Sequence, residues 1–145
     1  MRLALDQART ASMHGDVPVG AVIIDQAGDL LAAAGNEREI RHDPTAHAEI
    51  LVLREASRRL RSWRLTGLTL VVTLEPCTMC AGASVLARVA HVVYGADDPK
   101  AGAAGSLWDV VRDRRLNHRP EVTGGVRAEE SATLLRAFFR AQRGL

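Results

Sequence analysis

Residues 68–96 read "LTLVVTLEPCTMCAGASVLARVAHVVYGA" and contain the pattern that decides the fold. The run 68–74 is apolar and rich in β-branched residues, which is typical of a buried strand. Pro76 then begins a segment of good helix formers, a favoured residue at a helix start. The run 91–96 is a second apolar strand pattern. The stretch therefore predicts a strand, a helix and a strand in succession.

The N-terminal side of this stretch contains two more helices and two more strands. Residues 2–14 have apolar side chains at helical spacing, which predicts an amphipathic helix. The apolar runs 17–25 and 30–36 are separated by a turn sequence and predict a β-hairpin. A loop at 41–47 then precedes a second amphipathic helix at 46–61.

The C-terminal side begins with a Gly- and Ala-rich loop, for which we expect a short helix at 108–113. Residues 121–125 are expected to form an edge strand. The long connection 97–120 suits a parallel partner, because an antiparallel neighbour needs only a short turn. Residues 128–143 predict a closing amphipathic helix. Its expected buried side carries Leu134, Leu135, Phe138 and Phe139.

Strands that alternate with helices predict one domain over residues 1–145, a three-layer α/β/α arrangement around a five-stranded mixed sheet. Hydrophobic residues make up 47% of the chain and charged residues 25%, a balance typical of globular proteins. No apolar run is long enough to span a membrane, and the N-terminal segment lacks a secretory signal pattern. We therefore expect a cytoplasmic protein with reduced thiols and no membrane partner.

The charge of the chain gives weak information about its partner. The formal net charge is +2. Arginines gather in 54–64 and again in 112–119, and each cluster on its own is best explained as a solvated surface. The charge pattern permits an RNA partner without requiring one.

The only two cysteines, Cys77 and Cys80, stand three positions apart at the predicted strand–helix junction. Such a pair forms either a redox dithiol or part of a metal site. His47 begins another predicted helix, and two facing helix starts would complete the three protein ligands of a catalytic zinc. Glu49, two residues further on, is the natural proton carrier. H-x-E followed by P-C-x-x-C is the signature of zinc deaminases acting on nucleobases, tRNA adenosine deaminases among them.

This ligand set predicts hydrolytic deamination. Zinc lowers the pKa of bound water from about 15.7 to about 7, so that hydroxide is available at neutral pH. The hydroxide would attack the carbon that bears the amino group, while Glu49 carries the proton to the base and then to the departing ammonia. One zinc ion per subunit is expected.

Longer stretches resemble the bacterial tRNA-specific adenosine deaminases, a family within the zinc-dependent cytidine and deoxycytidylate deaminase superfamily. The similar stretches extend from about residue 17 to 122 and include "RHDPTAHAEI", "TLEPCTMCAGA" and "KAGAAGSLWDV". The resemblance implies a cytidine deaminase-like fold. It also implies attack at C6 of the wobble adenosine in a tRNA anticodon, an arginine tRNA being the expected substrate, which yields inosine.

The resemblance also implies residues that hold the substrate. Asn36 is similar to the asparagine that hydrogen-bonds the flipped base, and Ala48 would offer its backbone N–H to the same ring. Val17 and Pro18 resemble residues of a pocket wall.

A second group of implied residues concerns the RNA backbone. Asp98 and Lys100 resemble residues that hold the ribose and phosphates beside the target nucleotide. Asp97 departs from the family pattern, in which a basic or neutral residue is common. The family also implies a homodimer, and the small, apolar segment 78–87 would fit a close contact between subunits.

Three alternatives remain open from the sequence. A guanine or cytosine deaminase acting on free bases would use the same zinc ligands and Glu49. A structural zinc domain could bind RNA without turnover, and a dithiol oxidoreductase would use Cys77 and Cys80 without metal.

Overall fold

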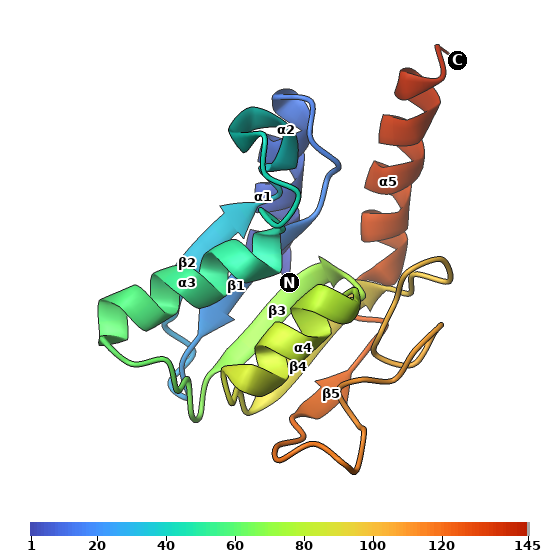
Figure 1. Cartoon of the computed structure of the whole chain (residues 1–145). Helices are drawn as coiled ribbons and strands as arrows, with labels where there is room; N and C mark the ends of the chain where they lie inside the picture. The colour runs from blue at the N-terminus through green and yellow to red at the C-terminus, as the bar shows by residue number, and fades with distance from the viewer. Residues whose placement is uncertain (145) are drawn as a thin grey trace.

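The computed structural model describes residues 1–144, so that Leu145, the last residue of the predicted domain, lies outside the description. Helices and strands alternate along the chain (Figure 1). In order, they are α1 (Arg2–Met13), β1 (Gly20–Ile24), β2 (Leu30–Gly35), α2 (Arg38–Arg41), α3 (Ala48–Leu60), β3 (Thr69–Leu74), α4 (Thr78–Leu86), β4 (His91–Ala96), β5 (Glu121–Thr123) and α5 (Ala128–Gln142).

The five strands form one mixed sheet in the order β2-β1-β3-β4-β5. β1 pairs antiparallel with both β2 and β3. β3 and β4 are parallel, as are β4 and β5. The predicted hairpin and the parallel edge strand are therefore both confirmed.

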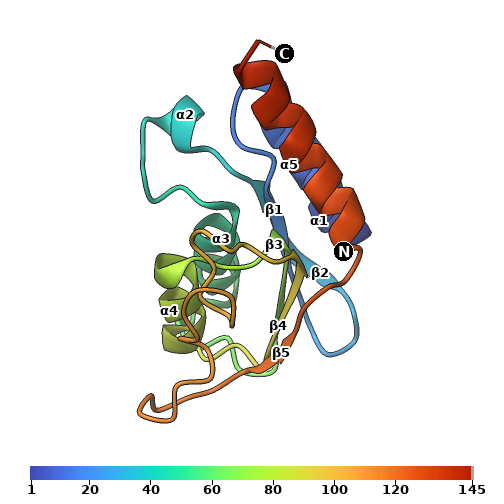
Figure 2. The same cartoon turned by 90° about the vertical axis from the view of Figure 1, so that its right-hand side faces the viewer.

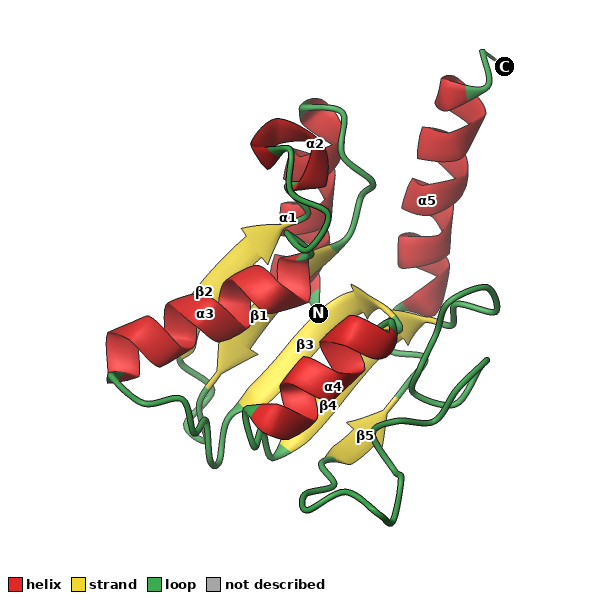
Figure 3. Cartoon of the chain, in the orientation of Figure 1, coloured by secondary structure: helices red, strands yellow, loops and turns green. Residues whose placement is uncertain are grey.

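Helices cover both faces of the sheet. Figure 2 shows α1 and α5 on one side of the strands and α3 and α4 on the other. This is the predicted three-layer α/β/α arrangement. Figure 3 shows that a long irregular segment connects β4 to β5, beside α4. No helix among residues 1–144 combines the length and the apolar composition that crossing a membrane requires.

The core is aliphatic because the chain has few aromatic residues. Ile23, Leu70 and Val72 on the strands and Val52 on α3 are fully buried. Each such side chain contributes about 1.5–3 kcal/mol on burial. This packing holds α3 against the sheet and so fixes the position of its N-terminal end.

Two glycines allow α1 to pack unusually close to the sheet. A Cβ atom on Gly20 would lie 2.0 Å from the Ala4 carbonyl oxygen, and one on Gly35 would lie 2.5 Å from the Gln7 carbonyl oxygen. Only a residue without a side chain permits such close approach of a strand to a helix backbone.

One prediction about the C-terminal third is wrong, and another is confirmed only in part. Residues 108–113 form no helix, because their backbone donors bond elsewhere: Trp108 N–H donates to the Gly102 carbonyl and Val110 N–H to that of Ala103. On α5, Leu135 packs against the core and Leu134 and Phe138 are half-buried, but Phe139 is 44% exposed. Figure 1 shows the reason, since α5 leaves the sheet after its first turns. The one-turn helix α2, which the sequence analysis missed, lies between β2 and α3.

Candidate active site

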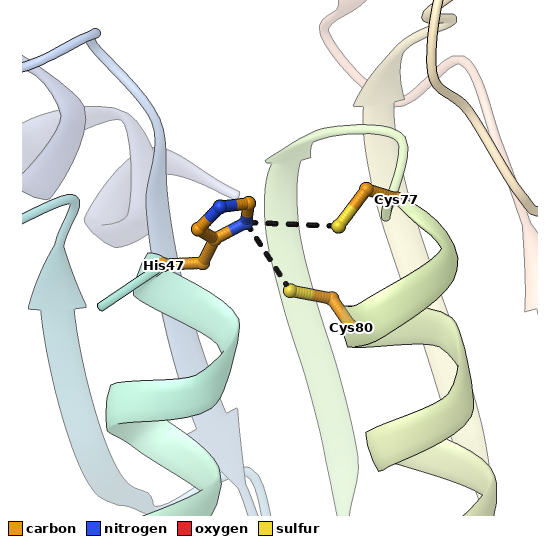
Figure 4. Close-up of side chains that lie close together, drawn as sticks. All are labelled: His47, Cys77 and Cys80. Atoms are coloured by element: carbon orange, nitrogen blue, oxygen red, sulfur yellow. Dashed lines mark hydrogen bonds between the residues drawn. The ribbon is translucent and has the colours of Figure 1, made fainter. Parts of the chain in front are cut away.

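The predicted metal ligands meet where two helices begin. His47 is the N-cap residue of α3 and Cys77 that of α4, and both adopt extended backbone conformations. Cys80 lies in the first turn of α4 and is buried. Figure 4 shows the imidazole of His47 pointing between the two sulfur atoms. Packing of both helices on the same face of the sheet thus brings together residues thirty positions apart.

The distances match a tetrahedral zinc site. His47 Nδ1 lies 3.7 Å from Cys77 Sγ and 3.5 Å from Cys80 Sγ. Bond lengths of about 2.0–2.1 Å to nitrogen and about 2.3 Å to sulfur place tetrahedral N and S ligands about 3.6 Å apart. The three ligand atoms all lie within 4.8 Å of one another. The donor set and its spacing therefore fit zinc, with one tetrahedral position left for water.

The two thiols have opposite protonation behaviour. The hydrogen bond from Cys80, with a further contribution from His47, lowers the pKa of Cys77 to about 4. The same hydrogen bond, together with burial, raises the pKa of Cys80. Cys77 thus favours the thiolate form and Cys80 the thiol form, and a divalent cation displaces the proton from a thiol ligand. The hydrogen bond to Cys77 also raises the pKa of His47.

Glu49 lies beside this group of candidate ligands. Its side chain is only 4% exposed, and it lies in the first turn of α3, two residues after His47. Burial raises the pKa of its carboxyl group, because a low-dielectric surrounding disfavours the charged form. A buried carboxyl group with a raised pKa is suited to accept a proton and return it.

A cavity of about 670 Å³ opens at this group. Seven of the ten predicted site residues line it: Val17, Asn36, His47, Glu49, Cys77, Asp98 and Lys100. Asn36 follows β2 and is 5% exposed, and its side-chain Oδ1 has no hydrogen-bond partner among the described residues. A buried amide oxygen without a partner on a cavity wall is free to accept a hydrogen bond from a ligand.

The other three predicted residues do not line the cavity. Pro18 is buried, and its neighbour Val19 stands on the wall instead. Cys80 lies behind the wall, within reach of His47. Ala48 is fully buried as the first residue of α3. Its backbone N–H belongs to the first helical turn, where amide groups lack an intrahelical acceptor.

The sequence analysis missed several wall residues, among them Arg38, Glu75, Leu135, Arg136 and Phe139. The last three belong to α5, whose apolar stripe was assigned to the core. Arg38 and Glu75 had no spacing signal of their own. Glu75 lies beside the P-C-x-x-C motif. Burial opposes its charge, but hydrogen bonds from Ser106, Asp98 and Ala104 lower its pKa.

Comparisons with known proteins establish the family. Residues 1–143 match the MafB19-like deaminases. Over 143 residues the chain is 50% identical to the tRNA-specific adenosine deaminase of Bacillus subtilis (strain 168), covering 99% of this chain and 88% of that protein. The chain belongs to the tRNA-specific adenosine deaminases, within the MafB19-like deaminase family. Membership in the tRNA-specific adenosine deaminases confirms the resemblance seen in the sequence.

Solved structures of deaminases have the same fold. A structure from a study of A-to-I editing by tRNA:A34 deaminases at the wobble position of transfer RNA has a TM-score of 0.89 and 45% identity, covering 93% of this chain and 97% of that one. The guanine deaminase of Nitrosomonas europaea has a TM-score of 0.78 and 26% identity, covering 93% and 80%. The cytidine deaminase-like fold is thereby confirmed.

Proposed function

We propose that this protein converts adenosine to inosine at the wobble position of a tRNA anticodon by zinc-dependent hydrolysis, in one deaminase domain. The main support is the group of His47, Cys77 and Cys80, which lies beside the buried carboxyl group of Glu49 at the wall of a cavity. The family match over residues 1–143 supports one deaminase domain. His47, Cys77 and Cys80 would hold one zinc ion per subunit. When bound, zinc supplies Lewis-acid activation of water near neutral pH.

Glu49 moves the protons of the reaction. It takes a proton from the attacking water and gives it to a ring nitrogen of adenine, while a bond forms between C6 and the water oxygen. Glu49 then transfers a proton from the new hydroxyl group to the amino group. The bond between C6 and the amino nitrogen breaks and ammonia leaves, so that water and adenosine become inosine and ammonia.

Asn36 and the backbone N–H of Ala48 hold the adenine ring in this proposal. The unpartnered Oδ1 of Asn36 and an amide at a helix start are two groups that a buried base can engage without displacing an existing bond. Val17 and Val19 supply apolar wall, with Pro18 buried beside them. A base reaches such a pocket when it is splayed from a loop, which favours an anticodon over a duplex.

Asp98 and Lys100 bind the ribose and phosphates beside the target. The carboxylate of Asp98 accepts hydrogen bonds from the backbone N–H groups of Lys100 and Ala101, at 3.1 and 3.3 Å. This turn presents Lys100 at the cavity rim, where its ammonium group suits a phosphate. An arginine tRNA is the expected substrate.

A homodimer is the expected assembly, formed through α4. The outer surface of α3 and α4 has an apolar groove, beside which Trp63 is 59% exposed and Leu86 is 70% exposed. Exposed apolar residues gathered in this way mark protein interfaces. Light scattering on Leu86→Arg should give a monomer, whereas Leu30→Arg, which alters an exposed leucine on β2, should leave the dimer intact.

The substrate is tested by supplying the zinc-loaded protein with four compounds in parallel. These are the anticodon stem-loop of an arginine tRNA, free adenosine, free guanine and free cytosine. Inosine from the stem-loop without ammonia from the bases supports the proposal. Ammonia from guanine or cytosine, with no inosine from the stem-loop, supports the alternative that the fold shared with guanine deaminase raises.

A further inference from the structure

Glu75 is a buried carboxylate directly after β3, and its four hydrogen bonds all come from one loop. Its side chain is 2% exposed. Oε1 accepts from the backbone N–H of Asp98 at 3.0 Å and from the hydroxyl group of Ser106. Oε2 accepts from the N–H groups of Ala104 at 2.9 Å and Ser106 at 3.0 Å. Both ends of the loop 98–106 are therefore tied to one side chain.

The backbone around Glu75 makes two further links. Its own N–H donates to the Ala96 carbonyl at 2.9 Å, and the Pro76 carbonyl accepts from Ala103 N–H at 2.7 Å. Gly102 leaves room for the carboxylate, because a Cβ atom there would lie 2.4 Å from Glu75 Cδ. Glu75 and Pro76, which lead from β3 into α4, are thus hydrogen-bonded both to the end of β4 and to the loop.

This loop forms one side of the cavity. The wall includes Asp97, Asp98, Pro99, Lys100 and Ala101. The candidate ligand atoms of His47, Cys77 and Cys80 all lie within 4.8 Å of one another, and Glu75 does not belong to this group. Glu75 therefore fixes the position of groups proposed to contact the substrate, while the proposed deamination involves Glu49 and the candidate metal ligands.

We propose that Glu75 is a positioning residue, which holds the loop 98–106 where Asp98 and Lys100 engage the nucleotides beside the target. This inference rests on the proposed function. Glu75 acts through the loop and touches no reacting atom. Its loss should weaken binding of the RNA without slowing the bound substrate.

The main test is Glu75→Gln, which keeps the shape but replaces one acceptor oxygen by a donor group. That change leaves loop N–H groups without an acceptor. We expect KM for the anticodon stem-loop to rise about tenfold or more, the effect of losing one hydrogen bond to a charged acceptor. We expect kcat to stay within about twofold and zinc to remain at one ion per chain, since the metal ligands are unchanged. Glu121→Gln makes the same chemical change at an exposed position on β5 and should leave both parameters unchanged.

A milder variant keeps the inference testable if Glu75→Gln does not fold. Ser106→Ala removes the hydroxyl donor and leaves the three backbone hydrogen bonds to Glu75 in place. We expect a smaller rise of KM, about threefold, with unchanged kcat. Loss of kcat and zinc in parallel in Glu75→Gln, with KM unchanged, would show a merely structural role and overturn the inference. Unchanged KM in a folded Glu75→Gln, or in Ser106→Ala when Glu75→Gln does not fold, would also overturn it. An inactive wild-type protein in the same assay would instead refute the proposed function.

Discussion

Substitution of Gly102 by alanine should disable the substrate side of the cavity. The new Cβ atom would lie 2.4 Å from Glu75 Cδ, 2.5 Å from Glu75 Oε2 and 2.6 Å from the Asp98 carbonyl oxygen. Ordinary contacts of this kind begin at 3.4 Å. The loop and the carboxylate must therefore separate by about 1 Å, and a misplacement of that size costs about a hundredfold in catalysis.

The assay is inosine formation on the anticodon stem-loop, with zinc content measured on the same sample. We expect kcat/KM to fall about a hundredfold while zinc remains bound, because the new Cβ atom meets Glu75 and Asp98 and none of the three ligand residues. Wild-type kcat/KM in Gly102→Ala would show that the position of the loop does not matter for activity, contrary to this prediction.

Three further predictions concern the base, the metal and the stability of α3. Asn36→Ala should lower kcat/KM about tenfold to a hundredfold through lost substrate hydrogen bonds, with an unchanged melting temperature; full activity would exclude Asn36 from base binding. Chelation of the metal should lower the melting temperature by about 5–10 °C, because zinc binds the folded state; readdition of zinc should restore it, and an unchanged melting temperature would argue against a metal bound to the folded state. Arg61 ends α3 at φ 50°, so Arg61→Gly should raise the free energy of unfolding by about 0.5–1 kcal/mol in urea titrations; a decrease would contradict this account of its strain.

The order of strands and helices could be predicted from the sequence because each element carries its own periodicity. β3 and β4 are apolar runs bounded by turn residues, and the long connection to β5 indicated its parallel pairing. The segment 108–113 could not be predicted, since its amide groups bond to Gly102 and Ala103. Such tertiary competition leaves no signal in a local helical pattern.

The metal group was predictable because its residues stand in two short motifs, each at a helix start. The rest of the cavity wall comes from segments without a motif. Phe139 and Leu135 have the spacing of a core-facing stripe, but both line the cavity, and Leu135 packs against the core as well. Glu75 could not be predicted, because its position after a strand is not distinctive in the sequence. Its role depends on hydrogen bonds from a loop distant in sequence, such as that from Ala104 N–H.

Glu49 is proposed to move protons at the site of His47, Cys77 and Cys80. Its most direct test is single-turnover inosine formation at the wobble adenosine by the zinc-loaded wild type and by Glu49→Gln. We expect inosine from the wild type and essentially none from the variant, with equal zinc content and equal affinity for the stem-loop. Comparable inosine formation by a zinc-loaded Glu49→Gln would contradict it.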